Sequence, residues 1–392
     1  MKRSAALIVT SVALATDMLV YGIAIPVLPR IASSSGASAS AVGVLFACYA
    51  IAMVIATPVA GVLVDRLGHR VPMLAGLFAL AGSTVLFAVV QALPALMVAR
   101  ALQGVAAAVS WTAGLALIAS VYPAAERAKP LGLALSASGL GVLLGPAIGG
   151  FLADHWGTRA PFMLAAAVAL LDGVARVVLV RDGEHVPAER PGRVWRHPTT
   201  GLMFGLTALG AGLIAFLEPI LPLRAAAAFS ASTNTIGLLF AAAVLAGVIA
   251  ASLSGFVADK VPRTALAAVG AVVAAGGLVL VAMSAALWML GAGLVLVAIG
   301  SQLVLVPTIA LISGIADEQS PPAYGAAYAL YSIAYTTGLM IAPLLAAAGS
   351  AVLPFAGVGL AAAALAAVLA VATALAGRRR PALAGTGTEP IH

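Results

Sequence analysis

Three carboxylates and two guanidinium groups lie inside segments that are otherwise apolar. The acids are Asp17, Asp172 and Glu218, and the bases are Arg100 and Arg176. A charged side chain at the centre of a bilayer costs about 2.5–3.5 kcal/mol on insertion scales, and such residues usually mark pathways for ions, protons or substrates. Because only 8% of the chain is charged, five charges at this depth predict that some of them bind a transported species.

The composition is that of an integral membrane protein. The 392 residues are 63% hydrophobic with a mean hydropathy of +1.13, and apolar runs of about 20 residues, enough to cross a bilayer, recur along the chain. The run after Lys2 and Arg3 is longer than the hydrophobic region of a signal peptide, so we expect a first span rather than a cleaved leader. The single cysteine, Cys48, excludes an intrachain disulfide.

We expect twelve spans, and their even number would place both termini on one side of the membrane. The approximate ranges are residues 5–29, 41–62, 72–91, 94–121, 131–153, 161–180, 202–223, 235–257, 264–284, 287–314, 323–347 and 353–376.

The basic residues outside these spans fall mainly on one side. Fifteen of the 20 Lys and Arg would lie on the side of the termini, and only Arg30, Arg159 and Arg224 on the other. Short cytoplasmic loops carry an excess of Lys and Arg. We therefore expect a multi-pass protein of the inner (cytoplasmic) membrane of the cell, with both termini in the cytoplasm.

Two motif pairs recur at nearly the same offset, which predicts a duplicated half. Pro26-Val-Leu-Pro29 ends the first span, and Pro219-Ile-Leu-Pro222 ends the seventh, 193 positions later. Asp65 after the second span and Asp259 after the eighth are 194 positions apart. Duplicated halves with a substrate site between them are typical of secondary transporters.

We therefore expect an all-α membrane fold of two six-helix bundles related by a pseudo-two-fold axis, which is a transporter architecture. The predicted parts are an N-terminal bundle at residues 1–180, a cytoplasmic linker at 181–200, a C-terminal bundle at 201–380 and a cytoplasmic tail at 381–392.

Asp17 is the first candidate for proton or substrate binding. It lies about 12 residues into the first span, near the midplane at about 1.5 Å per residue. Burial there favours the neutral carboxyl group and a nearby cation favours the carboxylate, so its proton can exchange with whichever side the cavity faces. The structural alternative is a static ion pair with Arg100, since a guanidinium at this depth needs a partner.

Glu218 is the second candidate. It precedes Pro219 near the external end of the seventh span, where a proline frees a backbone carbonyl and often kinks the helix. We expect proton or substrate binding at a bend, and a water-exposed carboxylate is the alternative. Asp172 and Arg176, four residues apart, have the spacing of an intrahelical ion pair, with a second proton relay as the alternative.

Four motifs resemble those of the major facilitator superfamily. Gly61–Arg70 is similar to its loop signature, and Arg100-Ala-Leu-Gln103-Gly104 is similar to its buried-arginine motif. Gly139–Gly150 resembles the span-five motif of the twelve-span drug:proton antiporters, and Asp17, Tyr21-Gly22 and Pro26-x-x-Pro29 resemble their first span. The resemblance covers essentially the whole chain.

A narrower resemblance links the chain to the vesicular amine transporters. It rests on Gly68–Met73, Ala160–Met163, Leu171–Gly173, Leu217–Pro222 and Tyr324–Ala329. It implies a proton-coupled exporter of organic cations, with Asp17, Glu218 and Arg100 at its binding site.

The chain also departs from those transporters. They carry acidic residues in spans ten and eleven, where this chain has Gln302 and Ser332, and a lysine in span two, where this chain has Tyr49. The missing charges bear on the proton stoichiometry and on the specificity for amines.

Aromatic and neutral polar residues are expected to line the cavity, because aromatic faces attract organic cations by about 0.5–2 kcal/mol. The candidates are Tyr21, Tyr49, Gln103, Trp111, Phe216, Gln302, Tyr328, Tyr331, Ser332 and Tyr335.

A third group is expected to act in gating. Asp65, Arg66 and Arg70 lie at a cytoplasmic helix end, where Asp65 can cap the next helix or pair with a basic residue across the two halves. The resemblance implies that this loop latches the cytoplasmic side. Small residues four apart permit close helix contact, and Pro146 and Pro219 add bends; the small residues are Gly141, Gly145, Gly149 and Gly150.

The predicted function is export of a hydrophobic, cationic small molecule, drug-like or amine-like, in exchange for protons by alternating access. The alternatives are proton-coupled transport of a neutral or anionic metabolite and, from another class, a non-transporting membrane sensor or scaffold.

The remaining expectations follow from what the sequence lacks. It contains no GxxxxGK[ST] phosphate loop, catalytic constellation or metal-ligand spacing, so we expect no enzyme, cofactor or metal. The expected partners are protons, the substrate and the lipid bilayer, with no obligatory protein partner and a monomeric state. The net charge of +7 is explained by membrane topology rather than by nucleic acid.

Overall fold

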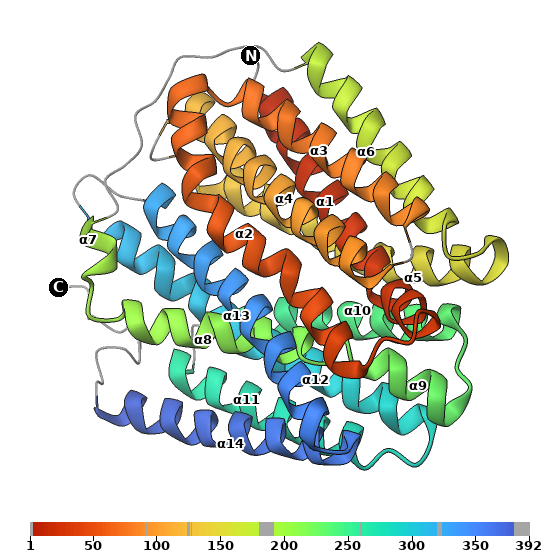
Figure 1. Cartoon of the computed structure of the whole chain (residues 1–392). Coiled ribbons are helices and arrows are strands. Elements are labelled where there is room, and N and C mark those ends of the chain that lie inside the picture. The colour runs from red at the N-terminus through yellow and green to blue at the C-terminus, as the bar shows by residue number, and fades with distance from the viewer. Residues whose placement is uncertain are drawn as a thin grey trace. The chain divides into compact units, whose positions relative to one another are not determined.

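The computed structural model describes residues 3–90, 92–123, 126, 128–179, 192–258, 261–319 and 324–379, most of them in helices (Figure 1). The helices are α1 Arg3–Ser34, α2 Ala39–Leu67, α3 Arg70–Val89, α4 Leu93–Val121, α5 Ala128–Trp156, α6 Ala160–Leu179, α7 Gly192–Trp195, α8 Thr200–Ala215, α9 Leu221–Phe229, α10 Thr233–Ala258, α11 Arg263–Ala282, α12 Leu287–Asp317, α13 Tyr324–Val352 and α14 Phe355–Arg379. The predicted all-α class is confirmed. Most of the expected linker and the whole expected tail lie outside the described residues.

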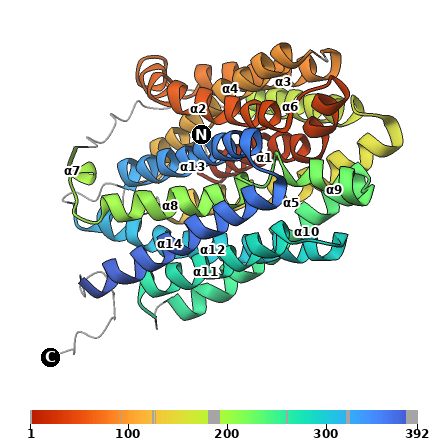
Figure 2. The same cartoon turned by 60° about the horizontal axis from the view of Figure 1, so that its bottom comes forward.

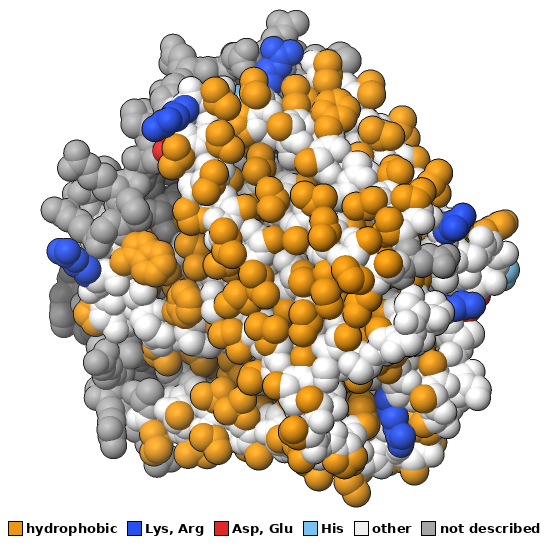
Figure 3. All heavy atoms as spheres, viewed as in Figure 1, with side chains coloured by type: hydrophobic (Ala, Val, Ile, Leu, Met, Phe, Trp, Pro, Cys, Tyr) orange, Lys and Arg blue, Asp and Glu red, His pale blue; other side chains and the backbone are white. Residues whose placement is uncertain are grey.

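The described helices have the length and composition of membrane spans. Eleven of them, α1–α6 and α10–α14, are long and apolar enough to cross a bilayer, and α8 is apolar but shorter. On the face of the molecule that Figure 3 shows, hydrophobic side chains cover much of the surface, and Lys and Arg side chains are few. The helices match the twelve expected spans, except that the seventh is interrupted.

The interruption in the seventh span lies between α8 and α9. Phe216 closes α8 with a backbone bond to Gly212, and residues 216–220 form turns before Leu221 starts α9. Pro219 has no N–H to continue the ladder, and Pro222 lies in the first turn of α9, where proline is tolerated. The same Pro-x-x-Pro pattern leaves α1 helical through Pro26 and Pro29, so the prolines alone do not cause the break.

The chain packs as two compact units. The first contains α1–α6 together with Glu218–Ala241, a segment that carries α9 and the start of α10; the second contains α7, α8 and the chain from Ala242 onward. Within the first unit, α1 packs most extensively on α5, and α2 and α3 pack on α4. Within the second, α11 packs on α12 and α14, and α8 packs on α12 and α13 (Figure 2).

Candidate functional site

The site in the first unit is built around Asp17 on α1. The side chain is only 1% exposed. Its Oδ2 atom accepts a hydrogen bond from the indole N–H of Trp111 on α4 at 2.8 Å and another from the hydroxyl of Tyr49 on α2 at 3.2 Å. Its Oδ1 atom has no hydrogen-bond partner among the described residues. Three helices therefore hold this carboxyl group, and one of its oxygens is left unused.

Glu218 is buried at the break between α8 and α9. It is 3% exposed, and its Oε2 atom accepts a hydrogen bond from the hydroxyl of Tyr21 at 2.5 Å. The alternative of a water-exposed carboxylate is therefore wrong for this structure. Glu218 is buried because the break turns the chain, so that Glu218 meets α1 within the first unit.

Arg100 on α4 does not pair with Asp17 in the described part of the chain. Its Nη1 atom donates to Gln103 Oε1 at 3.0 Å, whereas Nε and Nη2 are buried without a hydrogen-bond partner among the described residues. Gln103 in turn donates to Thr84 at 3.1 Å. The expected static ion pair is replaced by a different kind of contact.

That contact is with aromatic rings. The Arg100 Cζ atom lies 4.9 Å from the ring centroids of both Tyr21 and Tyr49 and 5.5 Å from that of Phe46. We call Tyr21, Tyr49 and Phe46 the aromatic cage. A cation within about 6 Å of a ring centroid is attracted by the negative face of the ring. The aromatic cage therefore stabilises part of the buried positive charge of Arg100, a role that the sequence analysis had given to Asp17.

The two tyrosines of the aromatic cage connect the two carboxyl groups. The rings of Tyr21 and Tyr49 lie 5.2 Å apart at 58°. The Tyr49 hydroxyl donates to Asp17 and the Tyr21 hydroxyl donates to Glu218. The arrangement can thus gain or lose a proton at two buried carboxyl groups around one fixed cation.

Sequence reasoning missed Phe46. The sequence does contain a feature that points to it. Phe46 precedes Tyr49 by three positions on α2, and residues three apart share a helix face. Of the predicted lining residues, three bind the two carboxyl groups in the first unit, namely Tyr21, Tyr49 and Trp111. A fourth, Gln103, binds Arg100 instead.

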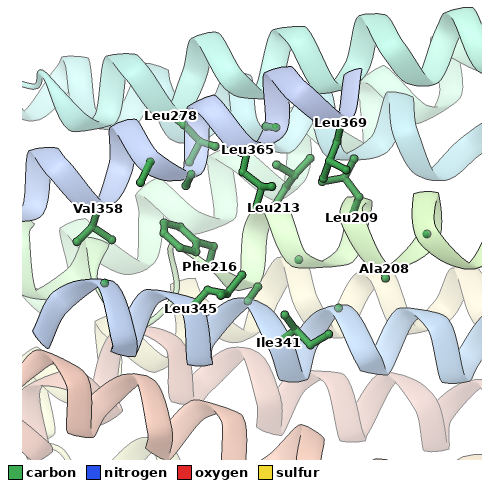
Figure 4. Close-up of a pocket in the computed structure, with 18 of the residues that line it drawn as sticks. Ala208, Leu209, Leu213, Phe216, Leu278, Ile341, Leu345, Val358, Leu365 and Leu369 are labelled. Carbon is green, nitrogen blue, oxygen red and sulfur yellow. The ribbon is translucent and has the colours of Figure 1, made fainter. Parts of the chain in front are cut away.

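The other predicted lining residues lie in the second unit. The rings of Tyr331 and Tyr335 stack 6.3 Å apart, and Tyr328 and Tyr331 pack against an apolar cluster that includes Met203. Gln302 lies against Gly247 of α10. The Ser332 carbonyl accepts a bond from Thr336 within α13. Phe216 lies in an apolar cavity with residues of α13 and α14 (Figure 4).

Asp172 and Arg176 form the expected intrahelical ion pair on α6. Both side chains are buried, and Arg176 Nη2 donates to Asp172 Oδ2. The pair satisfies the Asp172 charge locally, although Arg176 Nε and Nη1 have no hydrogen-bond partner within the described ranges.

The small residues of α5 pack against α1. A methyl group added at Gly145 would come within 2.8 Å of Gly22 Cα and of the Leu19 carbonyl oxygen, and one added at Gly149 within 2.8 Å of the Ile23 carbonyl oxygen. Gly141 packs on the same helix, near Ala15, and the Pro146 ring lies close to Gly22. Gly150 instead approaches Thr233 at the start of α10.

The Asp65 loop joins α2 to α3. Asp65 and Arg66 are exposed in the last turn of α2, and Gly68 ends the helix at a φ of 73°. The N-cap of α3 is His69, which makes no side-chain cap bond, and Arg70 starts the helix. The option that Asp65 caps α3 is therefore wrong, because Asp65 still lies inside α2.

One polar network was not predicted from the sequence. Arg30 at the end of α1 donates to Asp154 Oδ1 at 2.8 Å and to the Thr233 hydroxyl at 2.7 Å. The other oxygen of Asp154 accepts the backbone N–H of Asn234 at 2.8 Å, which caps the start of α10. The sequence marked Arg30 only as one of three basic residues on the external side.

Known proteins share the sequence pattern. The sequence model of the Major Facilitator Superfamily matches residues 10–204 and again residues 200–390. The chain is 30% identical over 307 residues to the synaptic vesicular amine transporter of Rattus norvegicus, covering 77% of this chain and 60% of the rat protein. It is 30% identical over 365 residues to the probable vesicular acetylcholine transporter-B of Danio rerio, covering 88% and 73%. The chain thus spans about 60% of the length of the rat relative.

Solved structures share the fold. A bacterial homolog to the human lysosomal transporter Spinster, in an inward-facing and unoccupied conformation, has a TM-score of 0.77 at 16% identity over 99% of both chains. The human organic anion transporter MFSD10 (TETRAN) has a TM-score of 0.68 at 17% identity over 95% of this chain and 99% of its own. At these identities the likeness shows the fold alone. Because the family match extends over almost the whole chain, this multi-pass membrane protein belongs to the major facilitator superfamily and resembles its vesicular amine transporters.

Proposed function

We propose that this protein exports a small hydrophobic organic cation in exchange for protons by alternating access. The observation that carries the proposal is the pair of buried carboxyl groups, Asp17 and Glu218, which are joined through the neighbouring rings of Tyr21 and Tyr49 around Arg100. The proposed place is the inner membrane of a cell, with both termini in the cytoplasm, as the distribution of basic residues favours.

The carboxyl groups suit exchange because neither is neutralised by a partner in an ion pair among the described residues. Asp17 accepts bonds from Trp111 and Tyr49, and Glu218 accepts one from Tyr21, all of them neutral donors. A proton and an organic cation therefore compete for the same negative charge. Antiport follows when binding of one favours release of the other, since a ligand shifts an equilibrium only by its differential affinity.

The aromatic cage supports a cationic rather than a neutral substrate. Its three rings already face one cation, the guanidinium of Arg100. Because Arg100 faces the rings of the cage, an organic cation can use them only in exchange for the guanidinium, and a neutral ligand would not compete for them. The relatives whose names mention amines and acetylcholine agree with this substrate class. Tyr49, which stands where those transporters carry a lysine, adds a neutral donor to Asp17 instead of a charge.

A second candidate function has one observation in its favour. Arg100 Nε and Nη2 are buried without hydrogen-bond partners among the described residues, and a guanidinium binds carboxylates through such paired donors. With Asp17 protonated, an anionic metabolite could take these donors.

Proton movement in proteoliposomes under an imposed pH gradient tests the proposal. The purified chain would be offered hydrophobic amines, their quaternary ammonium derivatives and neutral isosteres of matched size. Proton release triggered by the amines and lost in Asp17→Asn would support cation:proton antiport. A response to organic anions with none to amines would favour the second candidate.

A further inference from the structure

The second unit contains a cavity of about 390 Å³ that is separate from the carboxyl groups of the first unit. Its walls come from α8, α13 and α14, and Leu278 of α11 contributes from a fourth helix (Figure 4). Phe216, the first residue of the break that carries Glu218, extends into it with Leu213 and Leu345.

The side chains that line the cavity are all hydrocarbon. Every side chain in it is that of Ala, Val, Leu, Ile or Phe, and the remaining lining residues are glycines. Such walls offer no counter-charge for an ammonium group and no donor for a carboxylate, and an unpaired charge would be costly there. The occupant must therefore present an uncharged, flexible hydrocarbon surface.

The cavity is also elongated. Its walls extend from Gly205 to Phe216 along α8 and from Val358 to Leu369 along α14. Each of these stretches covers about three helical turns, or about 16 Å at 1.5 Å per residue. This length suits a linear chain that lies alongside the helices.

The rim of the cavity reaches the exposed surface of helices that have the length and composition of membrane spans. Ile341 and Leu345 on α13 and Leu365 on α14 line it and are still 44%, 48% and 49% exposed. The two helices contact each other only sparsely, because α14 packs mainly on α11. A gap that opens on the apolar surface between two spans meets the hydrocarbon interior of the bilayer, which consists of acyl chains.

We propose that this cavity binds one acyl chain of a membrane phospholipid between α13 and α14. The acyl chain fills the space between α13 and α14, which pack only sparsely on each other, and it lies against Phe216 at the break. This site is distinct from the proposed transport site, and its test does not depend on transport.

The test is photochemical labelling of the full-length protein in liposomes that contain a phosphatidylcholine with a diazirine on one acyl chain. We expect labelled peptides from Gly205–Phe216, Gly338–Leu353 and Val358–Leu369 to exceed, several-fold, those from the equally exposed face of α3 around Phe78. Labelling spread evenly over all exposed helix faces would overturn the proposal, since it would indicate ordinary surrounding lipid.

A pair of glycine variants sharpens the test. Gly205 lines the cavity, and a methyl group added there meets nothing within 4 Å, so Gly205→Leu fills space without a backbone clash. Gly201→Leu, one turn earlier on α8 and equally open, is the matched control outside the lining. We expect Gly205→Leu to lose most of the labelling and Gly201→Leu to keep it.

Two further outcomes would each overturn the proposal. One is unchanged labelling in Gly205→Leu at an unchanged melting temperature. The other is displacement of the label by a hydrophobic amine but not by unlabelled phosphatidylcholine, which would assign the cavity to the transported compound.

Discussion

Tyr21 donates a hydrogen bond of 2.5 Å to Glu218, although 197 positions separate the two residues. The bond ties the middle of α1 to the break in the seventh span. Tyr21 also faces Tyr49 and Arg100 with its ring. We therefore expect a change in the protonation of Glu218 to act on Tyr21. The ring of Tyr21 lies against Tyr49, which binds Asp17, and both rings face Arg100.

Asp17→Asn should abolish proton-driven transport and leave the protein folded. The amide oxygen can still accept the Trp111 and Tyr49 hydrogen bonds, but the side chain no longer binds a proton or carries a charge. Dye-reported proton flux in proteoliposomes measures the loss, and a melting curve checks the fold. Undiminished amine-triggered proton release would remove Asp17 from the proposed mechanism.

Glu218→Gln should weaken cationic substrates selectively. The substitution keeps an oxygen for the Tyr21 hydroxyl and removes the negative charge, so only ligands that use that charge are affected. Binding of an amine and of its neutral isostere, measured side by side on the purified variant, separates the roles. An equal loss for both would indicate that Glu218 serves the movement of the break rather than recognition of charge.

How much of this site could be predicted depends on how far apart its members lie in sequence. The Asp172–Arg176 pair follows from i,i+4 spacing alone and is confirmed. The expected pairing of Arg100 with Asp17 is wrong, because Gln103 and three aromatic rings contact the guanidinium instead. The observed rings come from α1 and α2, and their faces are set by side-chain packing that the sequence does not show.

The same limit applies to the helices. The number and approximate ends of the spans follow from hydropathy. A segment that crosses lipid must be apolar and must satisfy its backbone polar groups by its own helical hydrogen bonds. The break at residues 216–220 could not be separated from a kink, since Pro26 and Pro29 leave α1 intact. The Arg30 network has no local signal at all, because Asp154 and Thr233 reach it from two other helices.

Tyr21→Phe and Tyr21→Leu should separate the hydroxyl of Tyr21 from its ring. Tyr21→Phe removes the hydroxyl and with it the bond to Glu218. Bonds to a charged group are worth about 1.5–3 kcal/mol, so if this bond places Glu218 for the substrate, amine binding should weaken by about tenfold or more. Tyr21→Leu also removes a face from Arg100, which costs about 0.5–2 kcal/mol of stability beyond Tyr21→Phe. Amine titration and the melting temperature measure the two effects. Identical melting temperatures for both variants would argue against the ring contact.

Arg30→Gln should lower stability only slightly. Arg30 is 52% exposed in its ion pair with Asp154, and exposed pairs are worth about 0–1 kcal/mol because solvent screens them. Asp154→Ala should cost more, since it also removes the cap on the α10 N–H of Asn234, worth about 0.5–2 kcal/mol. The ranking can be read from denaturation midpoints of the two variants. A larger loss in Arg30→Gln would show that the ion pair outweighs the cap.

Gly145→Ala should destabilise the protein through the contact between α1 and α5. The added methyl group would lie 2.8 Å from Gly22 Cα and from the Leu19 carbonyl oxygen. These are backbone atoms, so one helix has to shift, and overpacking of this kind costs about 1–3 kcal/mol. Gly139→Ala on the same helix is the matched control, because nothing lies within 4 Å of its added methyl group and alanine is about 0.5–1 kcal/mol better than glycine inside a helix. We expect a lower melting temperature for Gly145→Ala and an unchanged or higher one for Gly139→Ala.

The same pair of variants tests for a proton leak. If the close packing of α1 on α5 also keeps protons from passing, liposomes with Gly145→Ala should leak protons without substrate. Equal melting temperatures and equal leak rates in both variants would show that α5 does not need glycine at position 145.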